Sequence, residues 1–329
     1  MARVAAQGAG CSPAVGLVDL TIRTNRLTDP ILFDETFMRK LEQLSLVVRR
    51  IKSGHYKGER RSARRGRSVE FADYRNYTRG DDLRALDWNI YARLERPFIK
   101  LFEEEVDQTV HLLIDASGSM NWPPDGALGQ ASARNKWRFG RQLLAALGYI
   151  ALSNQDRLYV ATLSAEGFTS WGPERRRQSV HHLLAFLSEQ PAGQDTNLNQ
   201  ALTRYAQQAK RPGLLFLISD FLTADPYQAG LSTLQQRGHE LSLLHLLSPD
   251  EIDPLLSGDF QLQDVETSLQ RDITINATLK RLYRRHFDAW QGDLQQFCSR
   301  RAINYALLST AQPFEALILR HLRQRGFVR

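Results

Sequence analysis

The sequence predicts an α/β fold with a doubly wound, mostly parallel sheet. Two short apolar runs carry this prediction, residues 110–114 ending in Asp115 and residues 214–218 leading to Asp220. Both runs have the composition of strands that helices cover on both faces of a parallel sheet. A third observation is that segments of helical and strand length alternate along most of the remaining chain. We therefore expect the two runs to be neighbouring strands of one sheet.

The other predicted elements follow in order. Apolar residues at helical spacing predict a helix over residues 136–152, and a strand is expected at residues 157–162. Further along, the patterns predict helices at 178–187 and 198–209, a strand at 241–247, a long helix from 279 to 297, a strand at 303–308 and a closing helix at 314–322. The single apolar stripe of the long helix is typical of a helix that packs on a core.

The loop after the first strand groups three oxygen-bearing side chains. It reads Asp115-Ala116-Ser117-Gly118-Ser119, and Gly118 allows it to bend sharply. In open α/β sheets, ligands bind outside the carboxyl ends of the strands, where alternate residues of this loop can point inward together. A carboxylate and two hydroxyls suit Mg²⁺ better than zinc, which prefers Cys and His. The loop therefore predicts a magnesium site.

Two residues further along the chain complete a possible ligand set. Asp220 ends the second strand, and Thr196 precedes the helix predicted from Leu198. With Asp115, Ser117 and Ser119, they resemble the metal-ion-dependent adhesion site of von Willebrand factor A domains. The resemblance implies that the loop residues and Thr196 bind Mg²⁺ or another divalent cation directly, and that Asp220 acts through water. It also implies a von Willebrand factor A-like, Rossmann-like domain. Alternatively, the serines cap the following turn and Asp220 only ends a strand.

Composition is compatible with this architecture. The chain has 329 residues, of which 42% are hydrophobic and 24% charged, so it can form one large domain and a smaller one. It has no apolar run long enough to cross a membrane. We interpret residues 1–26 as a disordered leader. Cys11 and Cys298 lie far apart without a metal-binding spacing, so a reducing, cytoplasmic location is expected.

Positive charge is concentrated in residues 49–67. This segment has nine basic residues and one acid, Glu59, whereas the whole chain has a net charge of +7. Such a segment can neutralise phosphates, but Tyr56 is its only aromatic residue for base stacking, and no recognisable nucleic-acid-binding fold accompanies it. A nucleic-acid-binding protein using this segment remains an alternative. We favour a solvated or partner-facing segment.

The block that follows, residues 69–93, mixes aromatic residues with charges of both signs. It contains Glu70-Phe71, Arg75, Tyr77, Gly80-Asp81-Asp82, Arg84, Asp87-Trp88 and Ala92-Arg93, after Gly66. This arrangement resembles the bacterial domain-of-unknown-function 58 family, in which such motifs precede a von Willebrand factor A-like domain. Many relatives have two membrane helices near the N-terminus, which this sequence lacks, so we expect a cytosolic form. We assign residues 27–105 to a smaller, family-specific N-terminal region and residues 106–329 to the von Willebrand factor A-like domain.

The charged block also supplies candidate partner-binding residues. They are Arg75, Asp81, Asp82, Arg84, Asp87, Trp88 and Arg93. Paired carboxylates near arginines are also what a metal-dependent hydrolase needs, which is a second alternative. Arginine–carboxylate pairs more simply fasten one segment to another. We expect Trp88 to pack against the domain.

The sequence contains no signature of a common enzyme class. It has neither a G-x-x-x-x-G-K-[ST] phosphate loop nor a G-x-S-x-G nucleophile elbow, and its histidines lack H-E-x-x-H spacing. We therefore expect a non-enzymatic protein-interaction module whose Mg²⁺ binds a carboxylate of a partner. The family resemblance implies the partner class, because its members are commonly encoded beside MoxR-type AAA ATPases and are thought to act with them as adaptors or co-chaperones.

Overall fold

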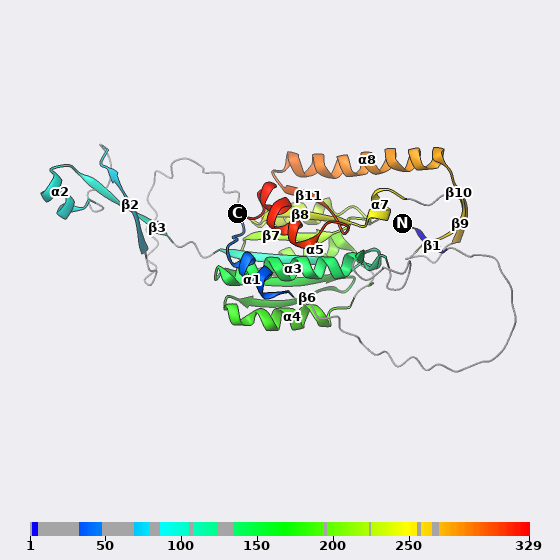
Figure 1. Ribbon diagram of the computed structural model, residues 1–329, viewed down its shortest axis with the longest axis horizontal. Helices are drawn as coiled ribbons and strands as arrows, with labels where there is room; N and C mark the ends of the chain where they lie inside the picture. Colours follow the sequence, from blue (N-terminus) through cyan, green and yellow to red (C-terminus); the bar gives the residue numbers. More distant parts are fainter. Residues whose placement is uncertain are drawn as a thin grey trace. The chain divides into compact units, whose positions relative to one another are not determined.

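A six-stranded sheet forms the centre of the larger of two compact units (Figure 1). The computed structural model describes residues 2–5, 33–47, 69–78, 86–104, 108–123, 134–191, 193, 196–223, 225–254, 258–264 and 270–329. In the order β11-β8-β7-β4-β5-β6, the strands are Asn304–Ser309, Glu240–Leu247, Leu214–Ser219, Thr109–Asp115, Arg157–Ser164 and Gly167–Glu174. All neighbouring strands are parallel except the antiparallel pair β5–β6. The predicted α/β fold class with a mostly parallel sheet is confirmed.

The two strands that carry the candidate site are neighbours, as predicted. Val110 of β4 lies opposite Leu214 of β7, and the pairing continues in parallel to Ile114 and Ile218. Every residue of both strands is buried. Alternate side chains enter different cores: Leu112 of β4 lies in the core on one face of the sheet, and Leu113 lies in the core on the other face. This burial on both faces explains why the two strands are continuous apolar runs rather than alternating ones.

Helices cover both faces of the sheet. One core contains residues of α1 (Glu35–Glu42), α3 (Lys136–Ser153), α4 (Val180–Glu189) and the π-helical turn η5 (Leu317–Leu322), with α9 (Phe314–Ala316) beside it. The other core contains residues of α5 (Leu198–Gln208), α6 (Gln228–Gln236) and α8 (Ala277–Arg300). The described part of the chain contains no helix with the length and apolar character of a membrane span.

An edge strand of the central sheet and a second, smaller sheet are among the features that were not predicted. The edge strand β6 contains two glycines and a proline and is largely exposed, so it lacks an apolar signature. A separate three-stranded antiparallel sheet has the order β1-β9-β10, formed by Ala2–Ala5, Gly258–Asp264 and Gln270–Ile275. Strand β1 lies within the segment interpreted as a disordered leader, and residues 6–26 of that segment are outside the described residues.

The chain divides into two compact units. One comprises residues 1–49 and 108–329, and the other comprises residues 50–107. The first unit thus includes α1, which buries Phe37 and Leu41 in the main core, although the sequence places residues 27–105 in a separate region. The smaller unit contains the antiparallel strands β2 (Val69–Asn76) and β3 (Phe98–Glu104), joined by a connection that includes α2 (Trp88–Leu94).

Candidate functional site

Asp115 is held at the carboxyl end of β4 by one neighbour in its own loop and one on the adjacent strand β7. Its Oδ1 accepts a hydrogen bond from the backbone N–H of Ser117 at 3.0 Å, and its Oδ2 accepts one from the Ser219 hydroxyl at 2.8 Å. The side chain is buried. Ser219 belongs to β7, so the pairing of the two strands fixes the orientation of the carboxylate. Sequence reasoning missed Ser219, whose only signal is its position directly before Asp220.

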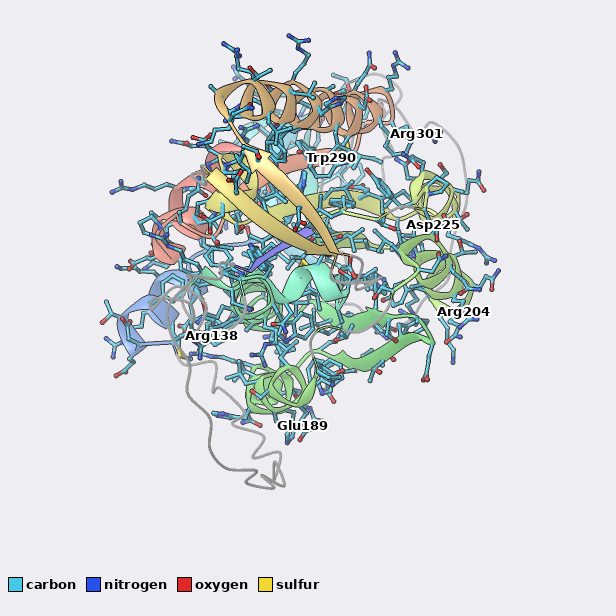
Figure 2. All side chains as sticks on the ribbon, turned by 90° about the vertical axis from the view of Figure 1, so that its right-hand side faces the viewer. Arg138, Glu189, Arg204, Asp225, Trp290 and Arg301 are labelled. Carbon is cyan, nitrogen blue, oxygen red and sulfur yellow. The ribbon has the colours of Figure 1, made fainter. Side chains whose placement is uncertain are left out.

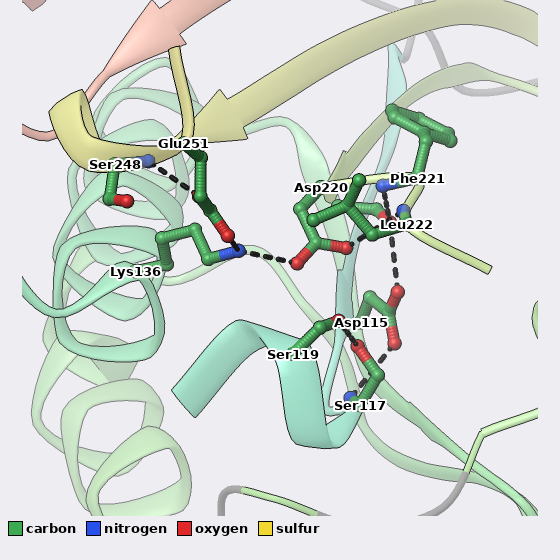
Figure 3. A network of polar contacts seen from close by, with 10 residues as sticks. Asp115, Ser117, Ser119, Lys136, Asp220, Phe221, Leu222, Ser248 and Glu251 are labelled. Carbon is green, nitrogen blue, oxygen red and sulfur yellow. Dashed lines mark hydrogen bonds and ion pairs between the residues drawn. The ribbon is translucent and has the colours of Figure 1, made fainter. Parts of the chain in front are cut away.

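The two serines of the loop lie together, as the sequence predicts. A short 3-10 helix, η2 (Gly118–Asn121), follows Ser117 and turns the chain back over the sheet edge. The hydroxyl oxygens of Ser117 and Ser119 are 3.1 Å apart. Ser119 also lies close enough to Asp220 to help lower the pKa of that carboxyl. Asp115, Ser117, Ser119 and Asp220 therefore converge at one end of the sheet (Figure 3).

Thr196 is the fifth predicted ligand, and the described contacts do not join it to the other four. Its hydroxyl oxygen is buried and has no hydrogen-bond partner among the described residues. The cap of α5 is the next residue, Asn197, whose side chain accepts from the backbone N–H of Gln200 at 2.9 Å. Gly193 lies beside η2, because a Cβ atom at this position would lie 3.7 Å from the side-chain amide nitrogen of Asn121. The Thr196 hydroxyl is therefore a buried oxygen without a described hydrogen-bond partner, and it is available as a metal ligand.

Lys136, which sequence reasoning did not single out, forms the strongest contacts of the site. It is the first residue of α3, its side chain is fully buried, and its ammonium nitrogen lies 2.6 Å from both Asp220 Oδ2 and Glu251 Oε1 (Figure 3). Helix α3 approaches β4 closely, since a Cβ at Gly140 would lie 2.9 Å from Ile114. The helix dipole disfavours a lysine in the first turn of a helix. This unfavourable position was the feature of the sequence that could have singled out Lys136.

Glu251 connects Lys136 to the short helix α7 (Pro249–Ile252). Its second oxygen accepts a hydrogen bond from the backbone N–H of Ser248 at 2.8 Å, at the start of that helix. Burial raises the pKa of Glu251, and the nearby ammonium only partly offsets this effect. Burial alone would also raise the pKa of Asp220, but Lys136 holds it below its usual range. The Lys136 ammonium is thus the chief counter-charge of Asp220.

Asp115 lacks such a counter-charge. Burial, together with the neighbouring charge of Asp220, raises the pKa of Asp115 to about 6. The described contacts of the Lys136 ammonium are with Asp220 and Glu251, so the lysine does not take the position expected for an ion between Asp115 and the serines. Three buried carboxylates therefore lie at this end of the sheet with one ammonium, which contacts two of them and not Asp115, so negative charge is in excess on the Asp115 side.

The donor set fits a hard divalent cation. No group of three His, Cys, Asp or Glu side chains among the described residues is arranged to hold a metal ion. An ion at this edge must therefore use hydroxyl as well as carboxylate oxygens. The Asp115 carboxylate, the Ser117 and Ser119 hydroxyls and the unpaired Thr196 hydroxyl are ligands of the kind that Mg²⁺ accepts. The excess negative charge is of the sign that a cation would neutralise.

A family model described as "Protein of unknown function DUF58" matches residues 73–293. The chain belongs to this family. It is 25% identical over 298 residues to the uncharacterized proteins Mb1516 of Mycobacterium bovis and Rv1480 of Mycobacterium tuberculosis, in alignments that cover 89% of this chain and 92% of each relative. The DUF58 match includes residues 73–93 of the charged block, the β4 loop and Asp220.

Two solved structures are similar to this DUF58 chain at low identity. One is the conserved hypothetical protein BatB from Bacteroides thetaiotaomicron, with a TM-score of 0.40 and 11% identity over 67% of this chain and 98% of that protein. The other is a von Willebrand factor type A protein from Catenulispora acidiphila, with a TM-score of 0.32 and 16% identity over 45% of this chain and 35% of that protein.

The charged block of this DUF58 protein is only partly described. Asp81, Asp82 and Arg84 lie outside the described residues, and so does the whole basic segment 49–67. Asp87 has a structural role, because its carboxylate caps α2 by accepting from the backbone N–H groups of Asn89 and Ile90. Trp88 is not buried within the smaller unit, and its expected packing against the domain stays a prediction.

Trp88 is 64% exposed in the smaller unit and stacks edge-to-face on Tyr91. Helix α2 is short and buries none of its residues, which explains why an aromatic residue on it stays in solvent. Arg93 lies in its last turn and is exposed, and Arg75 lies on β2. Their assignment to partner binding stays a prediction.

Proposed function

We propose that this protein is a non-enzymatic, metal-dependent protein-interaction module that acts in the cytoplasm with a MoxR-type AAA ATPase. The observation that carries the proposal is the convergence of Asp115, Ser117, Ser119 and Asp220 at the carboxyl edge of the sheet, with more buried negative charge than Lys136 neutralises. The ATPase assignment is supported by the family, whose members are commonly encoded beside such enzymes.

In this proposal, Asp115, Ser117, Ser119 and Thr196 hold Mg²⁺, and Asp220 acts through water. A bound Mg²⁺ supplies a positive centre with a position open to a carboxylate from the partner. The chain's own residues orient the ligands: Ser219 fixes the Asp115 carboxylate, and Lys136 keeps Asp220 ionised in its buried position. None of these side chains needs to exchange a proton or form a covalent bond for binding, which is consistent with a non-enzymatic role.

A binding experiment with a purified MoxR-type ATPase from the same organism tests the proposal. The ATPase is immobilised, and association of the wild-type protein is measured with Mg²⁺ and with EDTA. We expect EDTA and Asp115→Ala each to weaken binding at least about tenfold, because each removes one charge-assisted contact with the partner. Asp293→Ala, a change at an exposed position of α8, is the matched control.

Two results would contradict the proposal. Equal affinity of the wild type and Asp115→Ala for the ATPase, with or without EDTA, would exclude a metal-bridged contact. Binding that is lost equally in Asp115→Ala and Asp293→Ala would show an effect of net charge rather than of the metal. Circular dichroism of each variant confirms that the α/β unit is still folded.

A further inference from the structure

The first turns of α8 carry a concentration of positive charge. Residues 277–287 include Lys280, Arg281, Arg284 and Arg285 and no Asp or Glu. The N-terminal end of a helix dipole favours acidic side chains and disfavours basic ones. The helix dipole therefore does not account for these four charges.

The outer side of this helix segment is exposed. Arg281, Leu282 and Arg285 project from one face, and Leu282 is 46% exposed. In Figure 2, nitrogen-tipped side chains extend from α8 away from the sheet, whereas the labelled Trp290 points inward, where it contacts His245 at a ring distance of 4.9 Å. We call Arg281, Leu282 and Arg285 the basic face of α8.

The arginines of the basic face are available to a partner. Arg284, beside the face, lies 3.8 Å from Asp253 and 3.6 Å from Asp288. Within the described part of the chain, neither Arg281 nor Arg285 forms an ion pair. Arg281 donates only to the hydroxyl of Thr278, at 3.2 Å. An exposed leucine beside two such arginines is a combination that suits recognition of a mixed apolar and acidic surface.

The basic face belongs to the same edge of the fold as the candidate metal site. The Tyr283 hydroxyl donates to the backbone carbonyl of Glu251, and Glu251 in turn accepts from Lys136, which binds Asp220. Arg284 also donates to the carbonyl of Ile252 at 3.4 Å. The start of α8 is thus fixed to α7, and α7 to the site, by a short series of contacts.

We propose that the basic face of α8 docks an acidic protein surface that also presents an apolar side chain to Leu282, beside the metal site. This inference deepens the proposed function. It rests on the proposed function because it assumes that a protein partner binds at this edge of the fold. The exposed acids Asp259 and Asp272 on the neighbouring hairpin would repel a continuous layer of phosphates. A protein surface with separate acidic and apolar positions avoids that repulsion and gives Leu282 a partner.

Fluorescence anisotropy with a defined probe tests the inference on the full-length protein. The probe is a fluorescein-labelled peptide of repeating glutamate, leucine and glutamate, and the same peptide with glutamine in place of glutamate is its neutral control. We expect Arg281→Glu/Arg285→Glu to weaken binding of the acidic peptide at least about tenfold and Leu282→Ser to weaken it about threefold. Arg300→Glu/Arg323→Glu, which makes the same change in net charge at exposed positions elsewhere, should leave the affinity within about twofold of wild type.

Further measurements distinguish binding by the basic face from binding at the proposed metal site and from binding to a lipid surface. Peptide binding that depends on Arg281 and Arg285 but not on Asp115 or Mg²⁺ would support the basic face and count against the metal-bridged contact. Absence of binding to wild type, or equal loss in the two charge-reversal variants, would overturn the inference. It would also be overturned if the variant Arg281→Glu/Arg285→Glu lost binding to vesicles of phosphatidylglycerol and phosphatidylcholine while keeping its affinity for the peptide.

Discussion

The ammonium nitrogen of Lys136 lies 2.6 Å from a carboxylate oxygen of Asp220, and neither side chain is exposed to solvent. The second partner of this ammonium is Glu251, so one lysine contacts two carboxylates that follow different strands. Burial by itself would lower the pKa of Lys136, but its two carboxylate partners raise it, and the lysine stays charged. Both the geometry of Asp220 and the position of α7 depend on this charge.

Loss of the Lys136 charge should destabilise the protein strongly. Lys136→Met leaves two buried carboxylates without their cation, and removal of one partner from a buried ion pair is expected to lower the free energy of unfolding by about 3–5 kcal/mol. Urea unfolding followed by circular dichroism measures the change. Adding Glu251→Gln to Lys136→Met should restore part of the loss, because one of the two unpaired charges is then removed.

An exposed ion pair provides the matched control for this prediction. Lys40 pairs with Glu315, and both side chains are about half exposed. Lys40→Met should therefore change the free energy of unfolding by less than about 1 kcal/mol. Equal effects of Lys40→Met and Lys136→Met would mean that the buried network does not stabilise the fold.

A buried histidine pair should make the fold sensitive to acid. Burial, reinforced by His239, lowers the pKa of His111 to about 3, and burial lowers the pKa of His239 to about 4. The unfolded chain, with histidine pKa values near 6.5, binds more protons than the folded one between about pH 6.5 and 3. Stability should therefore decrease as the pH falls through this window, with His111 contributing a loss of about 3 kcal/mol by pH 4.

Urea unfolding between pH 7.5 and 4 measures this dependence. In His239→Phe, one of the two groups is absent, so the stability should fall less steeply with decreasing pH than in the wild type. The exposed His182 supplies the control variant, His182→Phe, whose curve should follow that of the wild type. Parallel curves for His239→Phe and wild type would show that this buried ring does not govern the acid response.

The roles of Asp87 and Trp88 should separate in mutants. Asp87 caps α2, so Asp87→Ala should lower the stability of the smaller unit by about 1 kcal/mol, whereas Asp87→Asn should keep most of the cap. Trp88 is exposed, so Trp88→Ala should leave the thermal unfolding curve unchanged while weakening binding to the ATPase at least about tenfold. Unchanged affinity in Trp88→Ala would remove this residue from the candidate partner-binding set.

The sequence predicts the centre of the fold better than its margins. Strands β4 and β7 are buried on both faces, so their apolar runs and their terminal carboxylates are visible without coordinates. Strand β6 lies at the sheet edge, and the hairpin strands β9 and β10 are rich in polar residues. None of these three strands therefore has a comparable apolar run. Burial on both faces is therefore what makes a strand predictable here.

The candidate site could be predicted as far as its oxygen donors. Asp115, Ser117 and Ser119 share one loop, and Asp220 follows the neighbouring strand, so the pairing of two strands suffices to bring them together. Lys136 could not be predicted in its role, because its partners lie 84 and 115 residues away in sequence and a lysine at the start of a helix is ordinarily exposed. Only tertiary packing places this ammonium beside Asp220.

Calorimetric titration of Mg²⁺ into the metal-free protein tests the central claim most directly. We expect one site per chain, loss of measurable binding in Asp115→Ala, an affinity about tenfold weaker in Thr196→Val, and wild-type affinity in the control Asp293→Ala. Failure of the wild type to bind Mg²⁺ or Mn²⁺ at millimolar concentration, or equal binding by wild type and Asp115→Ala, would contradict the account.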